Sequence, residues 1–178
     1  KLALACLLAG GHLLIEDLTG VGKTTLALAL AATLALSFQR VQFTPDMLPS
    51  DLTGSDIYRP EQGSFQFQRG PLFHNLILAD EITRAPAKVQ SALWEAMGEH
   101  QISVGMATYA LPRLFLGMAT QNPLEHEGTY PLPEAQLDRF LVQVDVEYPT
   151  RQTERDILIA TTGAEEAEAH QVFTTAEL

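Results

Sequence analysis

Three shortages stand out in this sequence: cysteine, basic residues and long apolar runs. Cys6 is the single cysteine, which excludes a disulfide framework and a cysteine zinc site, and the five histidines lack ligand spacing. Lysine and arginine number 11 against 22 aspartates and glutamates, and the net charge of −11 opposes a general nucleic-acid or anionic-membrane surface. No apolar run is long enough to span a membrane. The charge disfavours a nucleic-acid partner but does not exclude a local basic pore, and we expect a cytoplasmic protein without a membrane partner.

The 178 residues suit one domain and the start of a second, and the 46% of hydrophobic residues suffices for a core. Short apolar runs predict five strands, at 12–15, 40–43, 76–79, 114–119 and 141–146. Strong helix formers or an initial proline predict helices at 24–36, 86–98, 133–139 and from 150 towards 163. Two hairpins are predicted at 57–68 and 101–111, and a loop at 44–53. Strands that alternate with helices imply a parallel sheet covered on both faces.

Residues 20–25 read G-V-G-K-T-T and lie between the first predicted strand and the helix that follows it. Backbone N–H groups at a helix start lack partners, and together with the helix dipole they favour an anion there. Glycine lets the backbone curl around phosphate oxygens. Lys23 would reach the β- and γ-phosphates, and the Thr24 hydroxyl would ligate Mg²⁺. We therefore predict an ATP site with Mg²⁺, formed by Gly20, Val21, Gly22, Lys23, Thr24 and Thr25.

Asp17 departs from the phosphate-loop pattern, because it stands where G-x-x-x-x-G-K-[ST] has its first glycine. Aspartate tolerates a left-handed backbone, so the shape of the loop can survive. A carboxylate aimed inward would repel phosphate. We expect Asp17 to point away from the nucleotide. The simpler alternative for the whole motif is a glycine turn before an apolar helix.

Asp80 and Glu81 end the apolar strand L-I-L-A and form the second chemical signal. ATP hydrolysis needs a carboxylate near Mg²⁺ and a group that orients or deprotonates the attacking water. Asp80 fits the first role and Glu81 fits the second. A strand that runs into an exposed acidic turn is common in proteins, but downstream of a phosphate loop the catalytic interpretation is favoured.

Five stretches resemble the catalytic core of a MoxR-family AAA+ ATPase: G-V-G-K-T, Q-F-T-P-D-M-L-P-S-D-L-T-G, L-I-L-A-D-E-I-T-R-A-P-A-K-V-Q-S-A-L, A-T-Q-N-P and E-G-T-Y-P-L-P-E-A-Q-L-D-R-F. They lie between Gly10 and Pro149. The resemblance implies an α/β P-loop NTPase fold of AAA+ type, a three-layer αβα sandwich with a mostly parallel five-stranded sheet and two inserted β-hairpins. It also implies a nucleotide-binding core at 1–148, followed at 149–178 by a linker and the start of a truncated helical lid.

The resemblance assigns further roles beside Glu81. Asn122 matches the residue that positions the attacking water, and Arg139 matches the arginine finger that reaches the ATP of a neighbouring subunit. The simpler alternatives are an Asn-Pro turn for Asn122 and a helix-end arginine for Arg139. Thr44 matches the residue that restrains the catalytic glutamate, whereas Arg84 faces either a subunit interface or solvent.

The resemblance implies a Mg²⁺-dependent ATPase that forms a homo-oligomeric ring, expected to be a hexamer. Hydrolysis would drive chaperone-like remodelling or activation of a protein client, such as one with a von Willebrand factor A domain. Two other classes stay open. A nucleic-acid motor of the related helicase clade is disfavoured by the acidic charge. An ATP-binding scaffold with little turnover is favoured by Asp17 and by a lid that would lie beyond Leu178.

Overall fold

The computed structural model describes residues 1–17, 22–122, 130, 132–162 and 169–174. Five strands form one parallel sheet in the order β2-β5-β8-β1-β9. The strands are β1 Leu13–Asp17, β2 Phe38–Gln42, β5 Leu76–Asp80, β8 Leu116–Gln121 and β9 Val142–Val146. Because all five run the same way, their carboxyl ends lie at one edge of the sheet, where open α/β sheets bind ligands.

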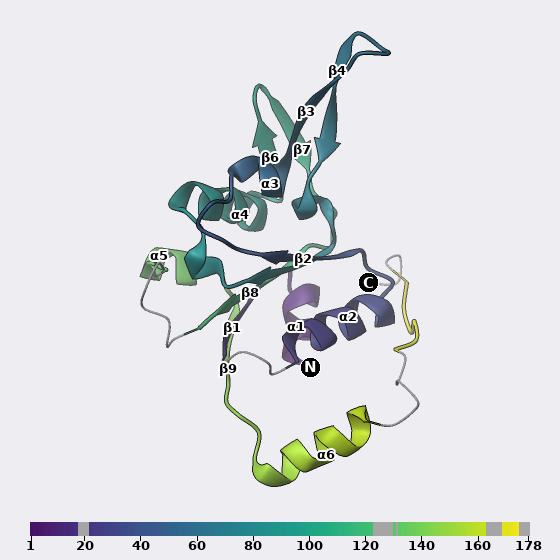
Figure 1. Cartoon of the computed structure of the whole chain (residues 1–178), viewed down its shortest axis with the longest axis vertical. Helices are drawn as coiled ribbons and strands as arrows, with labels where there is room; N and C mark the ends of the chain where they lie inside the picture. Colours follow the sequence, from purple (N-terminus) through teal and green to yellow (C-terminus); the bar gives the residue numbers. More distant parts are fainter. Residues whose placement is uncertain (18–21, 123–129, 131, 163–168, 175–178) are drawn as a thin grey trace.

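Helices cover both faces of this sheet (Figure 1). One face packs on α1 (Leu2–Leu8) and α2 (Lys23–Thr33), and the other on α3 (Pro49–Thr53) and α4 (Ala87–Glu99). Strand β5 feeds both cores, because its alternate residues point to opposite faces. The predicted three-layer αβα sandwich is confirmed. The shorter or peripheral helices are η1 Pro71–Phe73, η2 Ile82–Arg84, α5 Glu134–Leu137 and α6 Arg151–Thr161.

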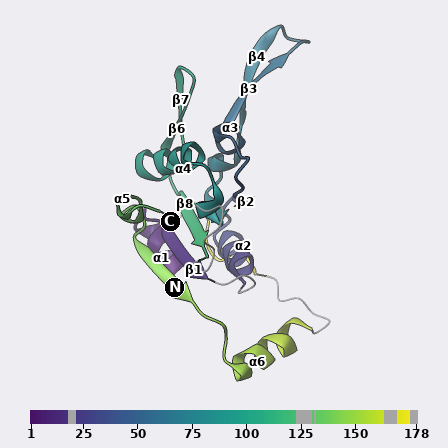
Figure 2. The ribbon, with the colours of Figure 1, turned by 60° about the vertical axis from the view of Figure 1, so that its left-hand side comes forward.

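Two antiparallel hairpins project beyond α4 (Figures 1 and 2). They are formed by β3 (Gly54–Arg59) with β4 (Ser64–Arg69), and by β6 (Gln101–Val104) with β7 (Ala107–Ala110). Phe67 of β4 stacks on Tyr109 of β7 with ring centroids 4.1 Å apart. An isolated hairpin is only marginally stable, so this stack lets the two hairpins support each other. Both predicted hairpins are confirmed.

Three local predictions are wrong. The predicted loop at 44–53 contains α3, whose start is stabilised because Asp51 accepts a hydrogen bond from the Leu48 N–H at 2.8 Å. Gly98 does not end α4; the helix continues to Glu99 and stops at His100, which takes the left-handed conformation at φ 51°. Helix α2 ends at Thr33, three residues before the predicted end at residue 36, because the backbone of Ala35 is left-handed at φ 51°.

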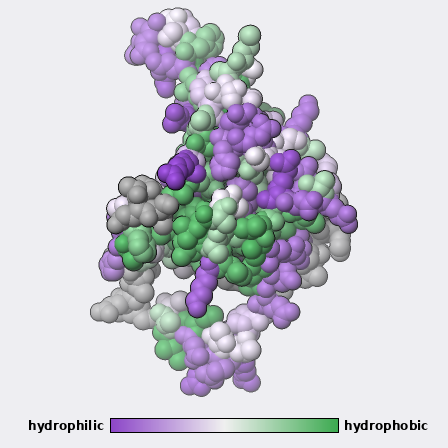
Figure 3. All heavy atoms as spheres, turned by 180° about the vertical axis from the view of Figure 1, so that it is seen from behind, coloured by the Kyte–Doolittle hydropathy of each residue, from purple (hydrophilic) through white to green (hydrophobic). Residues whose placement is uncertain are grey.

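Apolar side chains stay exposed on several helices. Leu8 of α1 and Leu26 of α2 expose 56% and 49% of their surface, and no residue of α6 is buried. Seen from behind, apolar side chains gather over the middle of the molecule, below the hairpins (Figure 3). Exposed apolar surface of this kind is typical of interfaces. Within the described part of the chain, no helix has the length and apolarity to cross a membrane.

His12 ties the sheet to α4 from the start of β1. Its Nε2–H donates to the Met97 carbonyl at 3.0 Å, and its Nδ1 accepts from the Gly117 N–H at 3.0 Å. Both bonds require the neutral ring with its proton on Nε2. Burial lowers the pKa of His12; the bond to the Met97 carbonyl opposes this shift and the nearby His100 adds to it.

We predict that mild acid weakens this connection. Because the folded-state pKa of His12 lies below the ordinary 6.5, the unfolded chain binds more protons than the folded chain in mild acid. The stabilisation that His12 provides is therefore complete above about pH 6.5 and is lost as the pH falls through the folded-state pKa. His12→Gln should lower the free energy of unfolding by about 1–3 kcal/mol near neutral pH, and the difference should narrow towards pH ~5. Urea unfolding followed by Trp94 fluorescence measures both, with the exposed His170→Gln as control. A difference that does not change with pH would contradict the prediction.

Candidate functional site

The predicted phosphate loop immediately precedes α2 in the sequence. Gly22 caps this helix in the left-handed conformation, with φ 84°, which strains any residue that has a Cβ atom. Helix α2 starts at Lys23, so Thr24 and Thr25 lie in its first turn. The predicted ligands Gly20 and Val21 lie outside the described residues, and so does the side chain of Asp17, whose orientation stays a prediction.

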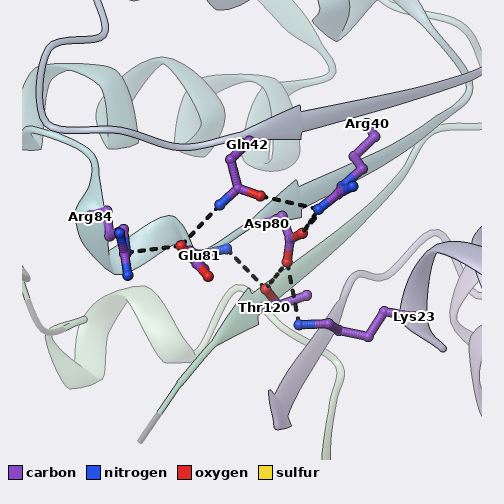
Figure 4. A network of polar contacts seen from close by, with 7 residues as sticks. All are labelled: Lys23, Arg40, Gln42, Asp80, Glu81, Arg84 and Thr120. Carbon is purple, nitrogen blue, oxygen red and sulfur yellow. Dashed lines mark hydrogen bonds and ion pairs between the residues drawn. The ribbon is translucent and has the colours of Figure 1, made fainter. Parts of the chain in front are cut away.

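Asp80 connects the phosphate loop with the acidic strand (Figure 4). It is the last residue of β5, whose five residues are all buried. Its Oδ1 lies 3.3 Å from Lys23 Nζ and accepts a hydrogen bond from Thr120 Oγ1 at 2.7 Å. The two motifs that the sequence analysis singled out, about 60 residues apart, therefore share one site.

The other oxygen of Asp80 is held by Arg40 on the edge strand β2. Oδ2 accepts from Arg40 Nε at 3.2 Å and from Arg40 Nη2 at 2.5 Å. Burial by itself would raise the pKa of Asp80, but the hydrogen bonds from Thr120 and Arg40 and the positive charges of Lys23 and Arg40 lower it overall. Asp80 is thus an ionised carboxylate at neutral pH, with both oxygens engaged.

Glu81 is turned away from Lys23. Its backbone is left-handed, with φ 58°, and its N–H donates to Thr120 Oγ1 at 2.9 Å. Its Oε2 accepts from Gln42 Nε2 at 2.9 Å and pairs with Arg84 Nε at 2.8 Å. Figure 4 shows the Glu81 carboxylate directed to this pair, on the side opposite Lys23. A positive φ in a glutamate is a strained conformation of the kind found at functional sites.

Arg40, Gln42 and Thr120 belong to the site although no motif in the sequence points to them. The family resemblance assigns the restraint on Glu81 to Thr44, whereas Gln42, two residues earlier, makes the contact. The hydroxyl of Thr44 instead hydrogen bonds to Asp46 and lowers the pKa of that carboxyl. One feature of the sequence could have identified Arg40 and Gln42: they are two positions apart in a predicted strand, so their side chains lie on the same face.

The remaining predicted residues are placed as follows. Asn122 directly follows β8, at the same sheet edge as Asp80. Arg84 belongs to η2 and pairs with Glu81, and its side chain is 40% exposed, so both predicted alternatives, a subunit interface or solvent, stay predictions. Arg139 Nη1 donates to the Trp94 carbonyl of α4 at 3.0 Å. A Cβ atom on Gly98 would lie 2.6 Å from this Nη1, so a larger residue there would displace the Arg139 guanidinium.

The residues at the site fit a magnesium ion shared with phosphates. Among the described residues there is no group of three or more His, Cys, Asp or Glu that could hold a metal by itself. Mg²⁺ usually binds through one or two carboxylates together with substrate phosphates and water. Asp80 at the end of β5 and the Thr24 hydroxyl at the start of α2 supply such a partial set of oxygen ligands.

Thr120 supports both acids, and we predict a specific cost for removing its hydroxyl. The Thr120 side chain is completely buried. Thr120→Val keeps its shape but leaves the Glu81 N–H and one acceptor position of Asp80 without their hydrogen-bond partner. The free energy of unfolding should fall by about 1–3 kcal/mol. Thr120→Ser, which retains the hydroxyl, should recover most of it. Equal stability of the Val and Ser variants in urea unfolding would refute the assignment.

Residues 12–142 match the family model described as ATPase family associated with various cellular activities (AAA). The chain is 49% identical to Chaperone MoxR1 of Mycobacterium tuberculosis over 97% of its own length and 45% of the relative's. It is 54% identical to YeaC of Bacillus subtilis, an uncharacterized protein, over 88% of its own length and 49% of the relative's.

A solved structure agrees with the sequence relatives. The 2.00 Å crystal structure of a Cytophaga hutchinsonii protein superposes with a TM-score of 0.87 at 45% identity, covering 98% of this chain and 53% of that one. The chain thus spans about half the length of the relatives it matches. The matches to the family model and to these relatives cover most of the chain, which therefore belongs to the MoxR family of AAA ATPases.

Proposed function

We propose that this chain binds ATP with Mg²⁺ and hydrolyses it to ADP and phosphate. The observation that carries the proposal is the 3.3 Å contact between Lys23 Nζ and Asp80 Oδ1, because it brings together the lysine proposed to bind phosphate and the acid proposed to bind the metal. Family membership supports ATP binding, and Mg²⁺ follows from the oxygen ligands at the site.

Each residue of the site has one task in this proposal. The N–H groups at the start of α2 and the ammonium group of Lys23 bind phosphate oxygens. Thr24 and Asp80 would hold Mg²⁺, which would neutralise charge on the phosphates. Glu81 accepts a proton from the attacking water, and Asn122 orients that water. Arg139 of a neighbouring subunit stabilises the charge that develops on the transferred phosphoryl group.

The geometry of Glu81 implies a restrained enzyme. Its carboxylate is held by Gln42 and Arg84 and is directed away from Lys23. A general base must come within hydrogen-bond reach of the water it activates, so these contacts must loosen before turnover. This favours slow hydrolysis in the isolated chain, which is the behaviour expected of the scaffold alternative. Hydrolysis coupled to a protein client remains our preferred function, since MoxR1, a close relative, is named a chaperone.

We predict that two substitutions separate binding from turnover. Lys23→Ala should abolish nucleotide binding, because it removes the cation that meets the phosphates. Glu81→Gln should leave ADP and ATP affinity within about twofold but lower the rate of phosphate release by roughly 10²–10⁴-fold. Fluorescent-nucleotide anisotropy and a steady-state phosphate assay measure the two effects. Phosphate release by the parent protein no faster than by Glu81→Gln would leave only the scaffold, and unchanged binding by Lys23→Ala would overturn the site.

We further propose that the full-length protein assembles into a ring, in which Arg139 acts on the neighbouring nucleotide. The exposed apolar side chains on α1 and α2 supply surface for such contacts. In the single chain Arg139 contacts its own α4, so it must leave the Trp94 carbonyl to act in the ring.

A mixing experiment tests the ring. Glu81→Gln and Arg139→Ala proteins should each be nearly inactive, but their mixture should regain part of the activity. Mixed interfaces would then combine an intact Glu81 with an intact Arg139 from different subunits. The exposed Arg113→Ala protein serves as the control and should be as active as the parent. No gain on mixing would argue against action between subunits.

A further inference from the structure

Arg40 is a residue to which the proposed reaction assigns no role, yet it makes the most extensive contact with Asp80. It lies on the edge strand β2 with its side chain 48% exposed, whereas the Asp80 side chain is 7% exposed. Its Nε and Nη2 both meet Oδ2, the oxygen that faces away from Lys23. Its Nη2 also donates to Gln42 Oε1 at 3.1 Å. The guanidinium is therefore held in a fixed orientation against the carboxylate.

Two cations compensate the charge of Asp80, and nucleotide binding would remove one of them. Lys23 faces Oδ1 in the structure, but the same ammonium group would have to turn to the phosphates when ATP binds. A buried carboxylate left without any cation is strongly unfavourable, because desolvation is then not offset. Arg40 meets Oδ2 from the opposite side, so the departure of Lys23 would leave this contact in place.

We propose that Arg40 is a positioning residue that keeps Asp80 charge-compensated and oriented while Lys23 transfers from Asp80 to the phosphates of a bound nucleotide. The nucleotide part of this inference rests on the proposed function. The charge compensation itself concerns only Lys23, Arg40 and Asp80, and it is testable on the ligand-free protein.

The ligand-free test is a double-mutant cycle in urea unfolding near neutral pH. Lys23→Met and Arg40→Met each leave one cation on Asp80, whereas the double variant leaves none. The unfolding midpoint of the double variant should therefore fall by more than the two single shifts combined. Arg59→Met, at an exposed position on β3, should combine additively with Lys23→Met. Additive shifts for the Lys23 and Arg40 pair would overturn the proposal.

The nucleotide test uses a fluorescent ADP analogue with and without Mg²⁺. In Arg40→Met, the departure of Lys23 leaves Asp80 uncompensated, so affinity without Mg²⁺ should fall roughly tenfold. Mg²⁺ replaces the missing positive charge, so the affinity gained on adding Mg²⁺ should be correspondingly larger than in the parent protein. Arg40→Lys, which keeps the charge, should recover most of the Mg²⁺-free affinity. A purely structural role for Arg40 would weaken binding equally with and without Mg²⁺ and would refute the proposal.

Arg84→Met is the matched control for local charge, because it removes a cation from Glu81 rather than from Asp80. It should leave the ratio of the two affinities unchanged; a ratio that rises as in Arg40→Met would reduce the effect to general electrostatics and overturn the role of Arg40. If the parent protein bound no nucleotide while the unfolding cycle was non-additive, the proposed function would fail and the compensation of Asp80 by Arg40 would stand.

Discussion

The ionised carboxylate of Asp80 is the constraint on which the rest of the site depends. It lies at the end of a fully buried strand, where an unpaired charge would be strongly destabilising. Lys23, Arg40 and Thr120, which come from α2, β2 and β8, satisfy it from three directions. The parallel sheet makes this possible, because it places the carboxyl ends of neighbouring strands together although their residues are about 40 positions apart in the chain.

Glu81 illustrates how one buried hydroxyl can organise two adjacent acids. Thr120 donates to Asp80 and accepts from the Glu81 N–H, so it fixes the peptide between them. The chain then turns through a positive φ into η2, which brings Arg84 back to the Glu81 carboxylate. Asp80 and Glu81 consequently point to opposite sides although they are neighbours (Figure 4). The division between an acid that faces Lys23 and an acid held by Gln42 and Arg84 follows from this local geometry.

Much of the fold and half of the site could be predicted from local patterns. G-V-G-K-T-T and L-I-L-A-D-E are contiguous stretches, and apolar runs identified all five sheet strands. Arg40 and Gln42 could not be assigned in the same way, because their contacts depend on the register of β2 against β5, in which Gln42 lies opposite Asp80. Helix α3 was missed because its five residues are too few for a periodic signal and its start depends on the side chain of Asp51.

The restraint on Glu81 is physically continuous with the first hairpin. Gln42 ends β2, and the next residue, Phe43, is completely buried and donates its N–H to the Asp80 carbonyl at 2.9 Å. The chain then passes through α3, anchored by the buried Leu52, into β3 and β4. Gln42 is therefore linked to the hairpin through two packed points, Phe43 and α3, with a more exposed stretch at 44–48 between them. Because close-packed interiors deform together rather than residue by residue, a displacement of Gln42 from Glu81 would also disturb its buried neighbour Phe43.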